Sequence, residues 1–351
     1  MSPPSAVGLR SEGLLDALEG RSQVVLVSHV NPDPDALASM MGLQALIEYK
    51  LPGIPVILTF DGMIARAENQ AMVDLLAIPL VPVESVPITP DSAVIMVDSQ
   101  PHTGRRASEA ATPVAVLDHH GTGGSLDGVI FRDIRANLGA TTTMVTGYLL
   151  EQEVPVSRRL ATALLYGIES EVLGYPREAS PADDGALVWL FPRADKDVLA
   201  RIRNPKLPRS YFATFQHALA NAFLYRDAVI CWCGPVTQPD IVAELADFFV
   251  RFDQVAWAFC VGQFEGQLKI SARCDHIGGE CGEVLRAAVE GLGTAGGHDR
   301  RAGGAIRLDQ EDGHTLDELL HIMRSRVLDQ LEIHDQQGCR LLESCPIIPA
   351  P

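Results

Sequence analysis

The sequence is poor in aromatic residues and in positive charge, and each shortage excludes a class of protein. Aromatic residues are 6% of the 351 residues, and 28 Lys plus Arg stand against 45 Asp plus Glu, which gives a net charge of −17. This charge repels the backbone of a long duplex nucleic acid. A phosphate-bearing ligand is therefore expected to be small, unless metal ions and placed arginines reverse the charge locally.

The sequence also lacks membrane signals and paired cysteines. No run of about 18 apolar residues occurs, and the first 20 residues lack a basic segment followed by an apolar one, so we expect a cytoplasmic protein without a membrane partner. The seven cysteines include no CxxC pair, which favours reduced, buried thiols. Cys231-Trp-Cys233 places two thiols on one face of a predicted strand and stays open as a minor metal or redox alternative.

Length and composition predict two globular domains. The chain is longer than one hydrophobic core usually serves, and 47% of its residues are hydrophobic. A charged, proline-bearing segment from about Ala194 to Pro208 marks the connection. We place a first domain at residues 1–195, a linker at 196–222 and a second domain at 223–351.

Three short apolar runs in the first third each end in polar residues. They are Val24–Val27 before Ser28-His29, Val94–Val97 before Asp98, and Val114–Leu117 before Asp118-His119-His120. Such runs, with a helix predicted over Ala36–Glu48, indicate an α/β domain with a mainly parallel sheet flanked by helices. Ligands bind beyond the carboxyl ends of such strands, so we expect these polar residues to form one cluster.

Later segments predict further helices and a second, smaller α/β domain. We expect helices at 141–150 and at 160–168, the latter ending near Gly167, with Glu169 and Glu171 just beyond it. The second domain has β-like runs at 228–232, 255–261 and 268–272, a helix at 282–290 and a glycine-rich turn at 296–304.

The polar strand ends predict a metal site. The first of these segments is His29-Val-Asn-Pro-Asp33-Pro-Asp35, and alone it is equally typical of an ordinary turn. With Asp98 and the Asp118-His119-His120 triplet, however, aspartate or histidine follows each of three predicted strands. Imidazoles and carboxylates without thiolates suit Mn²⁺, Fe²⁺, Co²⁺ or Mg²⁺ better than structural Zn²⁺. His102 and His314 have no such cluster of aspartates and histidines near them in the sequence.

Taken together with Gly296-Gly297-His298, these motifs resemble the DHH/DHHA1 phosphoesterases over nearly the whole chain. The resemblance implies an N-terminal DHH catalytic domain and a smaller C-terminal α/β DHHA1 domain that binds substrate. The family includes oligoribonucleases that also act on 3′-phosphoadenosine 5′-phosphate (pAp), dinucleotide hydrolases, a single-strand exonuclease and pyrophosphatases. The length and the absence of sensory domains look like the oligoribonuclease/pAp-phosphatase branch.

The resemblance also implies roles for individual residues. Two divalent ions, Mn²⁺ first among them, would be held by His29 and Asp33, by Asp35 and His119, and by Asp98 as a bridge. Glu171 stands where the family has a second bridging aspartate. His120 would face the scissile phosphate, and Asp118 would orient a histidine. The expected substrate-binding residues are Arg273, Gly296, Gly297, His298 and Arg301, with Arg300 as an alternative to Arg301.

The leading hypothesis is hydrolysis of phosphate esters in small nucleotides by metal-activated water, on short oligoribonucleotides, linear dinucleotides or pAp. A single-strand exonuclease would need a basic, aromatic-rich track. A pyrophosphatase would share the metal motifs, but the Gly-Gly-His turn favours nucleotides. A nucleotide-binding regulator without hydrolysis is favoured only by Glu171. A homodimer is left open.

Overall fold

The computed structural model describes residues 10–101, 112–121, 125–173, 179–297, 299–308 and 314–342. The chain divides into two compact units, Met1–Pro205 and Lys206–Pro351. The segment expected as a linker, 196–222, holds helix α7 (Lys196–Arg203) in the first unit and the whole of helix α8 (Arg209–Ala220) in the second. Leu199 and Ile202 of α7 are buried, so the charged residues there form the solvent face of an amphipathic helix.

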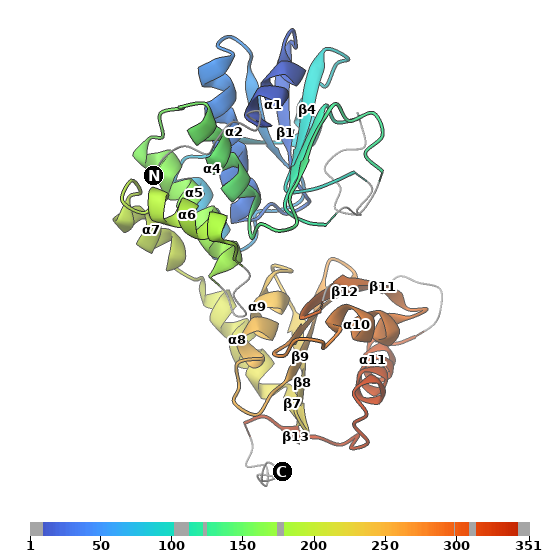
Figure 1. Ribbon diagram of the computed structural model, residues 1–351. Helices are drawn as coiled ribbons and strands as arrows, with labels where there is room; N and C mark the ends of the chain where they lie inside the picture. The colour runs from blue at the N-terminus through green and yellow to red at the C-terminus, as the bar shows by residue number, and fades with distance from the viewer. Residues whose placement is uncertain are drawn as a thin grey trace. The chain divides into compact units, whose positions relative to one another are not determined.

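The first unit contains a fully parallel six-stranded sheet of order β3-β2-β1-β4-β5-β6, which confirms the predicted α/β class (Figure 1). The strands are β1 (Gln23–Val27), β2 (Val56–Phe60), β3 (Leu80–Pro82), β4 (Ser92–Val97), β5 (Ala115–Asp118) and β6 (Phe131–Ile134). Strands β1, β4 and β5 are the three predicted apolar runs.

The described helices of this unit share one core with one face of the sheet. They are α1 (Arg10–Leu18), α2 (Pro34–Lys50), α3 (Ala67–Leu75), α4 (Thr141–Glu151), α5 (Arg158–Val172), α6 (Pro181–Leu190) and α7. Their apolar residues pack with Leu26, Ile95 and Leu117 of the sheet. A smaller core covers the other face, where Val25, Met96 and other strand residues meet the loop around the 3₁₀ turn Val83–Ser85.

The strand order reverses between β1 and β4, and this reversal positions the site. The chain leaves β1 for β2 on one side and continues from β4 to β5 on the other, so the connections after β1 and β4 run in opposite directions, and ligands of such sheets bind at this point. His29 follows β1, Asp98 follows β4, and the Asp118-His119-His120 triplet closes β5. The topology therefore brings together residues that are about 90 positions apart.

Helix α5 continues beyond Gly167, so the predicted helix end at this residue is wrong. The helix runs to Val172, which places Glu169 and Glu171 inside its last turns. A Cβ at Gly167 would lie 2.7 Å from the Ala38 Cβ and 3.0 Å from the Pro34 carbonyl oxygen. The glycine therefore serves close packing against α2, and not chain reversal.

The second unit is built on a seven-stranded sheet of order β11-β12-β10-β9-β8-β7-β13. Its elements after α8 are β7 (Ala222–Tyr225), β8 (Ala228–Pro235), α9 (Ile241–Phe249), β9 (Trp257–Phe264), β10 (Gln267–Cys274), α10 (Cys281–Val289), β11 (Gly293–Gly297), β12 (Arg301–Arg307), α11 (Leu316–Gln330) and β13 (Cys339–Arg340). Only the β8–β9 pair is parallel among the described pairs. Helices α8 and α9 cover one face of this sheet, and α10 and α11 cover the other (Figure 1).

The glycine-rich segment predicted as a turn forms a β-hairpin. Strand β11 pairs with β12 in antiparallel register, with Gly296 opposite Gly303 and Gly297 opposite Ala302. Only residues 298–300 connect the two strands. None of the helices in the described part of either unit is both long and apolar enough to cross a membrane.

Candidate metal centre

His29 presents a buried nitrogen atom to two carboxylates. Its Nδ1 lies 3.0 Å from the Val30 carbonyl oxygen, to which it donates, so Nε2 is the unprotonated atom of the neutral ring. Nε2 is 3.5 Å from both Asp33 Oδ2 and Asp98 Oδ2. Among the described residues this buried atom has no hydrogen-bond partner.

His119 repeats this arrangement from β5. Its Nδ1 lies 3.3 Å from the Leu138 carbonyl oxygen, and its Nε2 lies 3.5 Å from Asp98 Oδ1 and 3.8 Å from Asp35 Oδ2. In both histidines Nδ1 contacts a backbone carbonyl oxygen, and Nε2 faces carboxylates.

Asp98 lies between the two histidines, with one carboxylate oxygen toward each. Its backbone φ of +55° is in the left-handed region, which is uncommon for a residue other than glycine and is a strain found mostly at functional sites. The Asp98 amide donates to the Leu117 carbonyl oxygen at 2.8 Å, and the Thr141 hydroxyl donates to Asp98 Oδ1 at 2.9 Å. These contacts hold the buried carboxylate in place.

Asp35 is fully buried and is held by the first turn of helix α4. Its two oxygens accept the amide hydrogens of Thr141 at 2.8 Å and of Thr142 at 2.7 Å. Burial, and then the charge of Asp98, raise the pKa of Asp35 well above its usual range. Asp33 lies nearby as the N-cap of α2, where Oδ1 accepts the Ala36 amide at 3.0 Å and Oδ2 faces His29.

The donor set fits divalent cations. Two groups of side chains, His29 with Asp33 and Asp98, and Asp98 with His119 and His120, each bring their ligand atoms within 4.8 Å of one another. Unprotonated Nε2 atoms that face carboxylates repel them unless a proton or a metal ion lies between. Without a metal the proton is favoured: burial lowers the pKa of His119, but Asp35 and Asp98 raise it to about 9. Imidazole and carboxylate donors suit Mn²⁺ and similar ions.

His120 is oriented by Asp118. The His120 Nδ1 lies 2.8 Å from Asp118 Oδ1, which also accepts the His120 amide at 3.1 Å. Gln100 donates to the other oxygen of Asp118 at 2.7 Å. Burial raises the pKa of Asp118, but hydrogen bonds from His120 and Gln100 lower it below its usual range. Asp118 therefore stays a carboxylate and fixes the ring of His120.

Glu171 and Glu169 have different environments near the end of α5. The side chain of Glu169 forms an ion pair with Arg203 of α7. Glu171 is half-buried, and its charge contributes to the raised pKa values of Asp35 and His119. Of the two acidic residues, Glu171 is therefore the one that acts electrostatically on the metal centre.

The second unit places two of the expected arginines side by side. Arg273 on β10 is directly opposite Arg301 on β12, so both side chains leave the same face of the sheet. Arg273 pairs with Asp247 of α9, Nε to Oδ1 at 2.5 Å, whereas Arg301 is exposed. Arg300 is buried and donates to the carbonyl oxygens of Cys274 and Asp275, which gives it a structural role.

The two glycines expected to bind substrate, Gly296 and Gly297, lie on strand β11 and differ in how closely they are packed. A Cβ at Gly297 would lie 2.3 Å from the Arg301 carbonyl oxygen, whereas one at Gly296 would meet nothing within 4 Å. Gly297 is required by the hairpin itself, and only Gly296 leaves room above the backbone. His298, also expected to bind substrate, lies outside the described residues.

Sequence reasoning missed the residues that hold the site together. Gln100 orients Asp118, and Thr141 and Thr142 hold Asp35 and Asp98. The buried carboxylate of Asp183 fixes the same end of α4, since it accepts the Thr143 hydroxyl at 2.5 Å and the Gly139 amide at 2.9 Å. The one signal in the sequence was the run of three threonines at a predicted helix start.

Comparison with known families and curated proteins agrees with this architecture. Residues 23–168 match the model described as the DHH family, N-terminal domain. An uncharacterised protein of Methanocaldococcus jannaschii is 29% identical over 326 residues, which are 91% of this chain and 66% of that protein. An A-adding tRNA nucleotidyltransferase of Geobacter sulfurreducens is 31% identical over 186 residues, which are 48% of this chain and 19% of that protein. The chain thus spans only part of each curated relative.

Two solved structures share the fold at 15% sequence identity. An exopolyphosphatase-related protein from Bacteroides fragilis has a TM-score of 0.72 and covers 91% of this chain and 96% of its own. RecJ from Thermus thermophilus, solved in complex with Mn²⁺, has a TM-score of 0.51 and covers 94% of this chain and 56% of its own.

Proposed function

Residues 23–168 form an N-terminal domain of the DHH family, and from this premise we propose that the chain is a metal-dependent phosphoesterase. The proposed reaction is hydrolysis of phosphate esters in small nucleotides, namely short oligoribonucleotides, linear dinucleotides or pAp. Two divalent ions, Mn²⁺ in the first place, are the proposed cofactors. The Mn²⁺ bound by the RecJ structure supports the choice of metal.

The observation that carries the proposal is the placement of Asp98 between His29 and His119. Each histidine directs Nε2 at a different oxygen of this carboxylate, at 3.5 Å in both cases. A carboxylate that serves two imidazoles in this way is the arrangement that two ions sharing one ligand require.

Divalent ions at this site supply Lewis-acid chemistry at the phosphate and lower the pKa of water. The chain's own residues have separate tasks. Asp118 accepts from Nδ1 of His120, which orients the ring and leaves Nε2 as the atom that gives a proton to the departing oxygen. Burial of Asp35 and Asp98 lowers the local dielectric and strengthens each electrostatic contact.

The second unit supplies the proposed phosphate recognition. Arg273 and Arg301 are directly opposite on neighbouring strands, and like charges in such a pair are destabilising unless an anion lies between them. Asp247 neutralises one of the two. A phosphate group of the substrate is the proposed partner that both guanidinium groups share.

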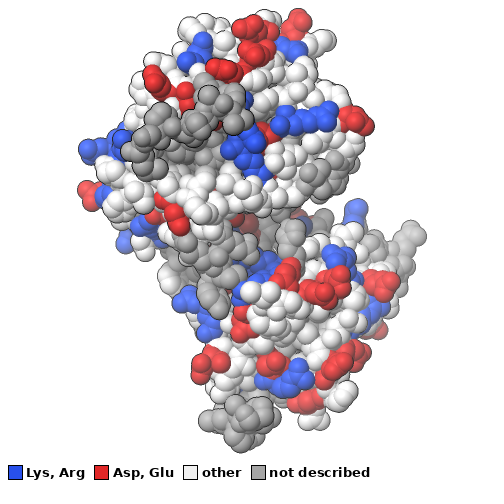
Figure 2. Space-filling model, in the orientation of Figure 1, with Lys and Arg blue, Asp and Glu red and all other residues white. Residues whose placement is uncertain are grey.

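The distribution of charge favours a short substrate. On the face shown in Figure 2, the described Lys and Arg side chains are interspersed with Asp and Glu, and do not gather into one band. A long single strand needs a continuous positive groove with aromatic platforms. On this face the charge distribution favours a short substrate over the long single strand of an exonuclease.

Two alternatives have a specific observation behind them. Likeness of fold to an exopolyphosphatase-related protein makes inorganic polyphosphate a second candidate substrate. A nucleotide-binding regulator remains a candidate because Glu171 departs from the expected aspartate. The complete His29, Asp33, Asp35, Asp98 and His119 set counts against the regulator, since binding alone needs no such set.

The test is turnover by the full chain after chelation. The metal-free protein is given Mn²⁺, Mg²⁺ or no metal, with pAp, a linear dinucleotide, pyrophosphate and polyphosphate as parallel substrates. We expect no turnover without metal and the fastest hydrolysis of pAp or the dinucleotide with Mn²⁺. Full turnover in chelator overturns the metal mechanism, and turnover confined to pyrophosphate or polyphosphate overturns the nucleotide specificity.

A further inference from the structure

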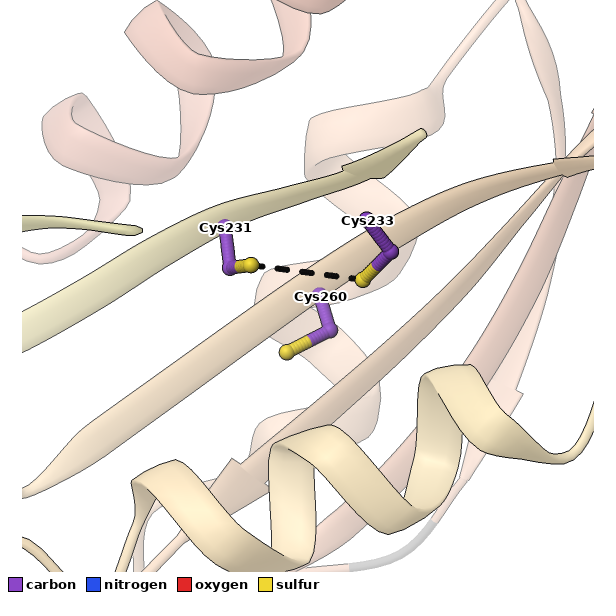
Figure 3. Close-up of side chains that lie close together, drawn as sticks. All are labelled: Cys231, Cys233 and Cys260. Atoms are coloured by element: carbon purple, nitrogen blue, oxygen red, sulfur yellow. Dashed lines mark hydrogen bonds between the residues drawn. The ribbon is translucent and has the colours of Figure 1, made fainter. Parts of the chain in front are cut away.

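Three cysteines of the second unit converge on one point inside its core. Cys231 and Cys233 lie two residues apart on β8 and so leave the same face, and Cys260 on β9 is in register with Cys231 (Figure 3). Their ligand atoms all lie within 4.8 Å of one another, and the Cys231 and Cys233 sulfurs are 4.0 Å apart. Exposed fractions of 0–2% place all three away from solvent.

The surroundings of this thiol cluster are apolar. It lies between the sheet and helices α8 and α9, among Val229, Leu245, Phe249 and Ala258. The described contacts of Cys231 outside the cluster include the Ala218 carbonyl oxygen at 3.4 Å. No carboxylate or histidine among the described residues joins these ligand atoms. The donor set is therefore sulfur alone.

We propose that Cys231, Cys233 and Cys260 bind a single copper(I) ion. Soft thiolate ligands select this ion, whereas structural zinc is almost always held by four ligands and this cluster has three. A planar three-sulfur site with metal–sulfur bonds of about 2.3 Å places the sulfurs about 4.0 Å apart, close to the Cys231–Cys233 separation. Thiol protons leave to the solvent as the metal–sulfur bonds form. This site uses no residue of the proposed phosphoesterase.

The test is copper(I) binding by the full chain, kept reduced, free of oxygen and stripped of other metals. Copper(I) is titrated in competition with a coloured copper(I) chelator, and X-ray absorption then reports the atoms bound to the metal. We expect a single ion per chain with only sulfur neighbours. No uptake, or a shell dominated by nitrogen, overturns the proposal, and neither result bears on hydrolysis with Mn²⁺.

Matched variants place the ion at this cluster. Cys233→Ala removes one of the three ligands and is expected to weaken binding by at least about 100-fold, more than loss of a residue that only supports a ligand. Cys281→Ala removes another buried thiol of the same unit and should leave affinity unchanged. Equal affinity in Cys233→Ala and the wild-type chain overturns the assignment. The sulfur shell of the wild-type chain tests the proposal even if a variant fails to fold.

Discussion

His29 Nε2 lies 3.5 Å from Asp98 Oδ2, and among the described residues this buried nitrogen has no hydrogen-bond partner. Burial lowers the pKa of His29, but Asp33 and Asp98 raise it well above its usual value, so a proton or a cation at Nε2 stabilises the pair. The contact to the Val30 carbonyl oxygen fixes the ring in this orientation. The histidine is thus arranged for a metal before one binds.

Replacement of Asp98 tests the shared ligand. Asp98→Asn keeps the shape but loses the charge, and the amide can no longer bind two ions through two anionic oxygens. A bound metal supplies several kcal/mol of transition-state stabilisation, so turnover should fall by about 10³-fold or more. The measurement is the initial rate on pAp at saturating Mn²⁺. His314→Ala, at an exposed position, is the control, and equal rates for the two variants mean that the site is misplaced.

Metal binding should release protons. Burial lowers the pKa of His119, but Asp35 and Asp98 raise it to about 9, so a metal ion must displace a proton at neutral pH. Affinity for Mn²⁺ is therefore expected to rise from pH 7 to pH 9. Calorimetric titrations in buffers of different ionisation enthalpy measure the released protons, and a proton count of zero at pH 7 contradicts the assignment.

The same shift predicts a pH effect on the metal-free fold. Because the folded pKa of His119 lies above its unfolded value of about 6.5, its protonation stabilises the fold fully below that pH. The contribution is lost as the pH rises through about 9. The melting temperature in chelator should therefore fall over this range, and His119→Ala should flatten the decline.

Gly167→Ala tests the packing beneath the site. A Cβ there would lie 2.7 Å from the Ala38 Cβ and 2.8 Å from the Thr142 hydroxyl oxygen, so α5 and α2 must separate. We expect a loss of about 1–3 kcal/mol in the free energy of unfolding, and weaker Mn²⁺ binding, since α2 carries Asp35. Gly147→Ala, within α4 and with nothing near its Cβ, should be neutral or stabilising. Equal melting temperatures contradict the packing argument.

Arg273→Ala tests the role of the second unit. Hydrogen bonds to charged groups are worth about 1.5–3 kcal/mol, so KM should rise about 10-fold to 100-fold while bound Mn²⁺ is unchanged. Arg226→Ala, which also removes an arginine paired with an aspartate in this unit, serves as control. Loss of metal from Arg273→Ala, with Arg226→Ala unaffected, contradicts the division of roles.

The fold and the metal cluster could be predicted because both depend on local patterns. Buried parallel strands are continuous apolar runs, and their carboxyl ends meet at one edge, so His29, Asp98 and His119 could be brought together without coordinates. The ion pair of Arg273 with Asp247 depends on how α9 packs on the sheet, and no local pattern carries that information.

The wrong helix end at Gly167 also reflects tertiary packing. Glycine is a weak helix former and was expected to end a helix there, yet packing against α2 overrides that propensity. The charged residues of 196–203, within the segment expected as a linker, belong to a helix whose spacing leaves Leu199 and Ile202 on one buried face. Gln100 and Thr141 escaped prediction because a supporting residue needs only a hydrogen bond, which many residue types provide.

Glu171 carries the last prediction, because it stands where the family resemblance expects an aspartate. A glutamate has one more methylene, so its carboxylate reaches about 1.5 Å further from the backbone. Its helical position near the end of α5 and its effect on the pKa values of Asp35 and His119 place its charge close to the metal centre. Glu169 is instead paired with Arg203.

We therefore expect Glu171→Gln to reduce both Mn²⁺ stoichiometry and turnover, and Glu169→Gln to leave both unchanged, because the Glu169 side chain is paired with Arg203. Metal titration and initial rates on both variants decide the matter. The loss of a negative charge should also lower the pKa of His119 in the metal-free chain, because Glu171 helps to raise it. If Glu171→Gln keeps the wild-type stoichiometry and rate but shows this lower pKa, then Glu171 acts only through its field, and the metal ions depend on His29, Asp33, Asp35, Asp98 and His119 alone.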